Sequence, residues 1–154
     1  MKRTHLEMRR KPVTILIADD DPEDQRLTSE ALAESDLAGS IRVVGDGEEL
    51  LDYLRHRGKY ADAASAPRPG LILLDLNMPR KDGREALREI KQDPALRRIP
   101  VTVLTVSHAE IDIRRVYDLG ANSYLCKPLS FTGLIEAMRL WSHFWLDTAE
   151  LPDQ

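Results

Sequence analysis

The chain is 154 residues long, 42% hydrophobic, and carries a formal net charge of −4 at pH 7. This length favours one globular domain with an ordinary core, and the acidic balance argues against nucleic acid as the main partner. The single cysteine, Cys126, excludes an intramolecular disulfide and no apolar stretch is long enough to cross a bilayer, so we expect a cytoplasmic protein that binds no membrane.

The sequence starts with a basic segment. Residues 1–11 carry five lysine and arginine side chains against one glutamate. Charges without an apolar face bind little on their own, so we expect a flexible tail in solvent rather than an anchor on a membrane or on nucleic acid. The segment also lacks the apolar centre of a signal peptide.

Five apolar runs alternate with five helical patterns along the chain. The predicted strands cover residues 13–18, 41–45, 71–75, 101–105 and 123–126, and the predicted helices lie near 23–35, 47–57, 83–92, 110–119 and 130–146. Because the strands are apolar throughout rather than alternating, we expect both of their faces to be covered. Five βα units with right-handed crossovers predict a doubly wound α/β fold of the flavodoxin-like type. This (βα)5 arrangement has a parallel five-stranded sheet in the order 2-1-3-4-5.

Local signals indicate where helices and loops begin. Asp21 and Pro22 suit the N-cap and first turn of the first helix, and Ser130 suits the N-cap of the last. Residues 58–70 are rich in alanine, proline and glycine, and predict one long irregular surface loop. The predicted domain covers residues 12–146, with a short tail at 147–154 and no output domain.

Carboxylates collect at the ends of two of the predicted strands. The first strand is followed by Asp19 and Asp20, and the third ends at Asp75. In the predicted order these strands are neighbours, and their carboxyl ends meet at the sheet edge where open α/β folds bind ligands. Several carboxylates there repel one another unless a cation joins them. We therefore expect a divalent metal with oxygen ligands, namely Mg²⁺.

Further polar residues fall at the same edge. Asn77, two positions after Asp75, offers a backbone carbonyl to the metal. Thr105 ends the fourth strand with a hydroxyl, and Lys127 ends the fifth with a positive charge; a cis bond at Pro128 would aim this lysine inward. A hydroxyl and an ammonium are groups that bind phosphoryl oxygens.

The expected chemistry follows from these charges. Transfer of a phosphoryl group to a carboxylate needs alignment and neutralisation of the phosphoryl oxygens more than acid–base help. Asp75 would attack in line, while Asp19, Asp20, Asp75 and the Asn77 carbonyl hold the metal. Each residue alone has an ordinary structural explanation, such as a helix cap or a solvated lysine. Together, however, they end four of the five predicted strands with a group that one reaction requires.

These residues resemble the receiver domains of two-component response regulators, over about residues 12–146. The shared features are Asp19-Asp20, the block Asp75-Leu-Asn-Met-Pro with Asp82-Gly83 after it, Thr105, and Lys127-Pro128. The resemblance implies a CheY-like fold in which Asp75 is phosphorylated by a partner histidine kinase or phosphotransfer protein. It also implies that Thr105 and Tyr124 relay the change to the surface, although Tyr124 taken alone is more simply a half-buried strand tyrosine.

A narrower resemblance concerns the stand-alone regulators that serve phytochrome-class histidine kinases. The chain shares with them the long loop before the third strand, the segment 79–85, and the Phe-Trp-Leu sequence at 144–146. This resemblance implies a red/far-red light-sensing kinase as the phosphoryl donor, and a homodimer.

Aromatic residues gather near the end of the chain. Trp141, Phe144 and Trp145 fall within five residues, and on a helix the two tryptophans share a face. An exposed pair of tryptophans requires a partner to cover it. With Ile113 and Tyr117 of the fourth predicted helix, they predict a two-fold dimer through the fourth helix, the fifth strand and the fifth helix.

Other functions fit parts of the pattern. A receiver could drain phosphoryl groups from a kinase or only scaffold, although the complete set of acids with Thr105 and Lys127 argues against a degenerate scaffold. A Mg²⁺-dependent phosphatase with an aspartyl nucleophile needs a second carboxylate two residues after it, where this chain has Asn77. A flavin-binding domain shares the strand order, but the carboxylates would repel its phosphate. We therefore expect a signalling phospho-acceptor rather than an enzyme.

Overall fold

Five strands form one parallel sheet in the order β2-β1-β3-β4-β5, which confirms the predicted doubly wound α/β fold. The strands are β1 (Ile15–Ala18), β2 (Ile41–Val44), β3 (Leu71–Leu74), β4 (Val101–Thr105) and β5 (Ser123–Cys126). This computed structural model describes residues 12–35 and 39–153, so the basic segment predicted at 1–11 lies outside the described residues.

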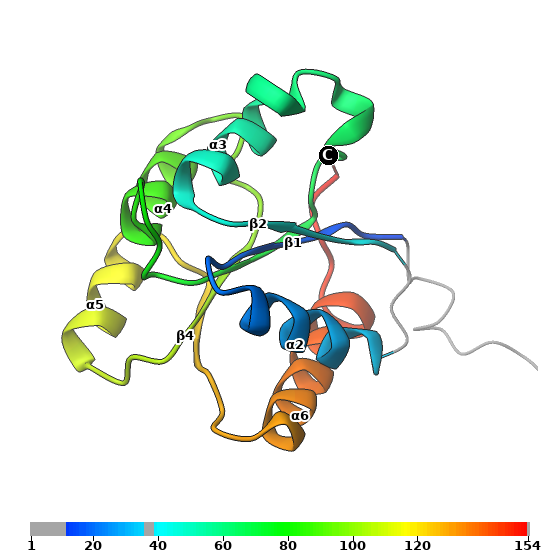
Figure 1. Ribbon diagram of the computed structural model, residues 1–154, viewed down its shortest axis with the longest axis vertical. Coiled ribbons are helices and arrows are strands. Elements are labelled where there is room, and N and C mark those ends of the chain that lie inside the picture. Colours follow the sequence, from blue (N-terminus) through cyan, green and yellow to red (C-terminus); the bar gives the residue numbers. More distant parts are fainter. Residues whose placement is uncertain (1–11, 36–38, 154) are drawn as a thin grey trace, which may run out of the picture.

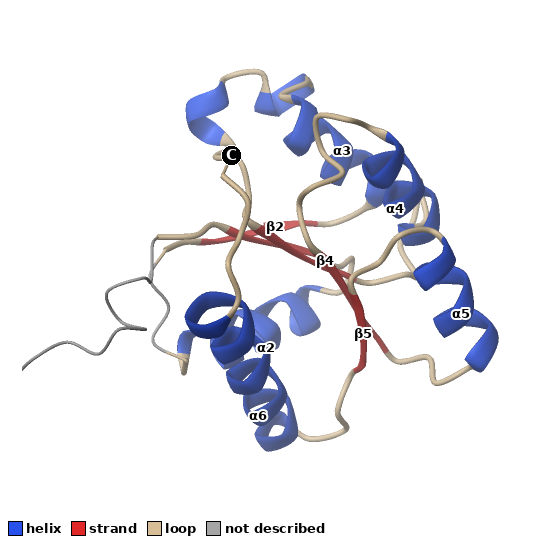
Figure 2. Ribbon diagram, turned by 180° about the vertical axis from the view of Figure 1, so that it is seen from behind, coloured by secondary structure: helices blue, strands red, loops and turns tan. Residues whose placement is uncertain are grey.

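Helices cover both faces of the sheet. On one face lie α2 (Pro22–Ala33) and α6 (Phe131–Ser142), and on the other lie α3 (Gly47–Arg55), α4 (Gly83–Gln92) and α5 (Glu110–Asp118) (Figure 1). The view from behind shows the same two layers with the sheet between them (Figure 2). The buried side chains accordingly form two clusters, with Ile17 and Leu73 under α2 and α6 and Leu16 and Leu74 under the other helices. Burial on both faces explains why the strand sequences are apolar throughout.

Side-chain caps begin four of the helices. The caps of α2, α3, α4 and α6 are Asp21, Asp46, Asp82 and Ser130, and each accepts a hydrogen bond from a backbone N–H of the first turn. The N-caps predicted at Asp21 and Ser130 are confirmed. The helix starts are therefore within one residue of the predicted ones.

The prediction is less accurate at the start of β1, at the end of the last helix and at Pro128. β1 begins at Ile15, two residues later than predicted, because its pairing with β2 and β3 starts there. The last helix changes after Ser142 into a π-helix, η3 (His143–Thr148). The described residues contain no cis peptide bond, so the cis bond expected at Pro128 is absent.

The long connection before β3 is not wholly irregular. It contains two short 3₁₀ helices, η1 (Gly58–Tyr60) and η2 (Ala63–Ser65). Tyr53 of α3 packs edge-on against Tyr60 and donates a hydrogen bond to the carbonyl of Pro67 (2.8 Å). These tertiary contacts, which the local sequence does not reveal, order the connection.

The end of the chain returns across the sheet. After η3 it passes from the side of α2 and α6 to the side of α3 (Figure 1). Leu151 packs against the buried cluster under α2 and α6, close to Gly70 at the start of β3. Among residues 12–35 and 39–153, no helix has the length and apolar character needed to span a membrane.

Candidate functional site

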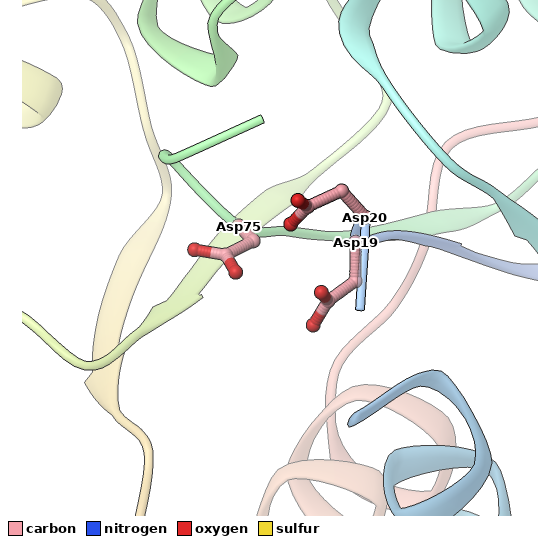
Figure 3. A group of neighbouring side chains, drawn as sticks. All are labelled: Asp19, Asp20 and Asp75. Atoms are coloured by element: carbon pink, nitrogen blue, oxygen red, sulfur yellow. The ribbon is translucent and has the colours of Figure 1, made fainter. Parts of the chain in front are cut away.

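The three predicted carboxylates meet at the carboxyl ends of β1 and β3. The register pairs Ala18 with Leu74, and the Asp75 N–H donates to the carbonyl of Ala18 (2.9 Å). As a result, carboxylate oxygens of Asp19, Asp20 and Asp75 lie within 4.8 Å of one another (Figure 3). Asp19 and Asp75 are buried, whereas Asp20 is exposed to incoming ligands.

This set of donors fits a hard divalent cation. All three groups offer carboxylate oxygen, the ligand type that Mg²⁺ and Mn²⁺ take. Burial raises the pKa of Asp19 above its ordinary value of 3.8, and the Asp75 charge adds to the rise, while hydrogen bonds from Lys127 and the Asp21 N–H oppose it. A cation bound between the carboxylates would offset the energetic cost of burying their charges and would reduce the repulsion between them.

Lys127 supplies the positive charge opposite these acids. Its Nζ donates to Asp19 Oδ2 (2.8 Å), Asp75 Oδ2 (3.0 Å) and Asp24 Oδ2 (3.0 Å). Burial acts to lower the pKa of Lys127, but the hydrogen bonds and charges of the three carboxylates outweigh it and raise the pKa. The lysine is therefore a firmly protonated ammonium, and it reaches the acids without a cis bond at Pro128.

Sequence reasoning missed Asp24. This residue lies in the first turn of α2, where an acidic side chain is ordinarily explained by the helix dipole. Only the tertiary structure brings that turn against the end of β5. The available signal was one more carboxylate in the turn directly after Asp19 and Asp20.

Thr105 closes the site from β4. Its buried hydroxyl donates to Asp75 Oδ1 (2.8 Å), and its backbone carbonyl accepts from the backbone N–H of Lys127 (2.7 Å). One oxygen of Asp75 thus accepts a hydrogen bond from the Thr105 hydroxyl, and the other accepts one from the Lys127 ammonium. These two bonds fix the orientation of the carboxylate.

The backbone after β3 stays close to Asp75 because α4 begins with glycine. A Cβ on Gly83 would lie 2.3 Å from the Asp75 carbonyl oxygen, so a larger residue would push the helix away. Asn77 is exposed, and its N–H lies 3.5 Å from Asp75 Oδ1. The Asn77 carbonyl as a metal ligand stays a prediction.

The loop between β3 and α4 is also tied to the start of α3. Arg80 has a left-handed backbone (φ 61°) and its guanidinium pairs with Asp46, the buried N-cap of α3. The Gly47 N–H donates to the Lys81 carbonyl (3.1 Å). The part of this loop at Arg80 and Lys81 is therefore held against the start of α3.

Tyr124 lies on β5 and contacts the loop after β4. Its hydroxyl donates to the Ser107 carbonyl (2.9 Å), and the Ser107 hydroxyl donates to Asp112 Oδ2 (2.7 Å). Arg84 of α4 donates to Asp112 Oδ1 (2.9 Å). Sequence reasoning missed Arg84 and Asp112, because an ion pair between two helices leaves no local signal. The function of Tyr124 as a relay stays a prediction.

The C-terminal aromatic residues do not share one exposed face. Trp141 is only 6% exposed, and its indole N–H donates to Thr102 Oγ1 (2.9 Å). The expectation that Trp141 lies on an outer face is wrong, because α6 turns this ring onto β4. Phe144 is 52% exposed and packs edge-on against the half-buried Trp145, with 5.1 Å between ring centroids.

Comparison with known sequences agrees with this arrangement. The model of the response regulator receiver domain matches residues 15–139. Response regulator Rcp1 of Synechocystis sp. is 44% identical to the chain over 141 residues, which cover 92% of the chain and 94% of Rcp1.

Solved structures superpose over nearly the same length. The phosphorylated cyanobacterial phytochrome response regulator RcpA matches with a TM-score of 0.86 and 47% identity, covering 92% of this chain and 99% of its own. The Mn²⁺-bound form of Rcp1 matches with a TM-score of 0.84 and 44% identity, and the match covers 92% of this chain and 100% of the Rcp1 chain. A response regulator in red light signalling of R. palustris matches with a TM-score of 0.86 and 40% identity, covering 93% and 99%.

Proposed function

The chain belongs to the response regulator receiver domain family, and from this premise we propose that Asp75 accepts a phosphoryl group from a partner histidine kinase. The observation that carries the proposal is the pair of hydrogen bonds to Asp75: one of its carboxylate oxygens accepts from the Thr105 hydroxyl and the other from the Lys127 ammonium. Both donors can turn from the carboxylate to phosphoryl oxygens over a short distance.

In the proposed reaction a carboxylate oxygen of Asp75 forms a bond to phosphorus. The bond from phosphorus to the imidazole nitrogen of the kinase phosphohistidine breaks, and its electron pair stays on that nitrogen. Lys127 and Thr105 then hold the phosphoryl oxygens and stabilise their charge. Attack of water on phosphorus later releases phosphate and restores the Asp75 carboxylate. The chain is thus a phospho-acceptor that processes only its own phosphoryl group.

We propose that Mg²⁺ completes the site, held by Asp19, Asp20, Asp75 and the Asn77 carbonyl. The ion would supply the positive charge that lets a carboxylate approach an anionic phosphoryl group. Support comes from the grouping of the three carboxylates and from the Mn²⁺-bound form of the related Rcp1.

The donor in this proposal is a histidine kinase of the phytochrome class, responding to red or far-red light. The support is similarity over nearly the whole chain to RcpA, a cyanobacterial phytochrome response regulator, and to a regulator in red light signalling of R. palustris. The lone Cys126 and the acidic composition suit a partnership in the cytoplasm that involves neither membrane nor nucleic acid.

Phosphorylation would be read at the surface formed by α5, β5 and α6, which we propose also pairs two copies of the chain. Tyr124 and Thr105 would carry the change there through the loop after β4, to which Tyr124 is bonded. Tyr117 of α5 is 49% exposed and Ile113 is half-buried. Phe144 and Trp145 border an apolar hollow of about 400 Å³ beside β5, which is an edge strand. Apolar area of this kind favours a partner.

The proposed donor is tested with a purified phytochrome-class histidine kinase that carries radiolabelled phosphate on its histidine. With Mg²⁺ present, the label should pass to the wild-type chain within minutes and should not pass to Asp75→Asn. Retention of all label on several such kinases would contradict a phytochrome-class donor, and equal labelling of Asp75→Asn would contradict the acceptor residue.

A further inference from the structure

Asp24 is the third carboxylate bonded to Lys127. Unlike Asp19 and Asp75, it is not in the group of carboxylates that could hold a metal ion. An ammonium has three N–H donors, and here they go to Asp19, Asp24 and Asp75. The side chains of Asp19 and Asp75 are 4% and 11% exposed, whereas that of Asp24 is 35% exposed. Asp24 therefore holds Lys127 from the solvent side.

The position of Asp24 gives it an effect on a phosphoryl group at Asp75. When Asp75 is phosphorylated, the N–H of Lys127 that pointed to its carboxylate turns to a phosphoryl oxygen. Asp24 then remains bonded to the same nitrogen, so its charge lies about 5 Å from the phosphoryl oxygens, the usual separation of two acceptors on one ammonium. Like charges at that distance repel and also share one counter-charge.

Loss of Asp24 would not release the lysine. Lys127 keeps its bond to the buried Asp19, and its backbone N–H keeps the bond to Thr105. Asp24 also borders a hollow of about 170 Å³ between α2 and the start of α6, where water can solvate its carboxylate. The electrostatic effect of Asp24 therefore outweighs its contribution to fixing the lysine.

We propose that Asp24 is a positioning residue that acts through Lys127: it weakens the hold of this lysine on the phosphoryl group, so that it limits the stability of the phosphorylated state. This inference rests on the proposed function, because it concerns the phosphoryl group that Asp75 would carry.

The test measures the affinity of the full chain for beryllofluoride, a small analogue of the phosphoryl group, at saturating Mg²⁺ by titration calorimetry. Asp24→Asn should bind it on the order of three- to tenfold more tightly than wild type, since one negative charge near the anion is lost. In a separate titration with Mg²⁺ alone, the same variant should bind the metal equally or more weakly. Tighter beryllofluoride binding without tighter Mg²⁺ binding distinguishes the proposal from damage to α2, which would weaken the binding of both.

Glu23→Gln is the matched control. Glu23 lies in the same first turn, but its carboxylate pairs with Arg26 on the exposed face of α2. It loses the same charge without touching Lys127, so its beryllofluoride affinity should stay at the wild-type value. Asp24→Glu keeps the charge and should also stay close to wild type, while Asp24→Ser provides a second neutral variant and should behave like Asp24→Asn.

Each outcome decides the inference. Unchanged or weaker beryllofluoride binding by both Asp24→Asn and Asp24→Ser overturns it, and so does an equal gain in Glu23→Gln, which would show a general charge effect. If the wild-type chain binds no beryllofluoride at all, the proposed function fails, and this inference fails with it.

Discussion

At the scale of single residues, the site depends on one ammonium among carboxylates. Lys127 forms ion pairs with Asp19 and Asp75, which are both buried. Its place after the fifth strand and the Lys127-Pro128 pair shared with receiver domains identified it in the sequence. The conjunction of strand ends predicted this residue, the carboxylates and Thr105. It could not predict Asp24, because the contact between α2 and the end of β5 arises only from the packing of the helices on the sheet.

Removal of the lysine should expose this dependence. Lys127→Ala leaves Asp19 and Asp75 without their cation, and we expect it to lower the free energy of unfolding by about 3 kcal/mol in metal-free buffer. Mg²⁺ should restore more stability to the variant than it adds to wild type, because it replaces the missing charge. Urea unfolding with and without Mg²⁺ measures both quantities. Equal metal-free stabilities, or equal gains from Mg²⁺, would contradict this electrostatic account.

At the scale of elements, residue types at the ends of helices and strands carry most of the predictable information. Apolar runs ending in Asp75 and Thr105 gave the strands, and caps such as Asp21 and Ser130 gave the helix starts. The end of the last helix and the packing of its side chains were harder to predict. The change of α6 into a π-helix and the burial of Trp141 depend on how α6 lies against β4, which periodicity alone does not reveal.

Asp46 joins two elements near the site and should make stability depend on pH. Burial alone would raise the pKa of Asp46, but hydrogen bonds from the Glu49 N–H and from Arg80 outweigh it and hold the pKa below its ordinary value of 3.8. A carboxyl with a lowered pKa contributes stability that is full above its ordinary value and is lost as the pH falls through the lower, folded value.

We therefore expect Asp46→Asn to lower the free energy of unfolding by about 1–2 kcal/mol at pH 7. The difference in the free energy of unfolding between the variant and wild type should become smaller below pH ~4, because Asp46 becomes protonated there. Urea titrations at pH 7 and at pH 3 test the expectation. A gap that is as wide at pH 3 as at pH 7 would show that the charge of Asp46 contributes little.

At the scale of the whole molecule, the site lies at one edge of the sheet and the proposed pairing surface lies along β5. The link between them is the loop after β4, held by Tyr124, Ser107 and Asp112. The ring of Phe144, which is 52% exposed, lies on that surface beside the apolar hollow.

The pairing surface is tested by Phe144→Ala. Loss of this exposed ring should weaken self-association by about tenfold, as for a central contact residue of an interface. Sedimentation over a concentration series measures the effect. Val43→Ala is the control, because Val43 is 37% exposed on β2, at the opposite edge of the sheet. A dimer unaffected by Phe144→Ala and by Trp145→Ala would exclude this surface.

The central claim is that Asp75 is the phospho-acceptor, and the most direct measurement is the intact mass of the chain after incubation with acetyl phosphate and Mg²⁺. The account predicts one phosphoryl adduct on the wild-type chain and none on Asp75→Asn. The same adduct on both proteins would contradict the acceptor residue. Absence of any adduct on the wild-type chain, with acetyl phosphate and with a phosphorylated histidine kinase as donors, would contradict the claim itself.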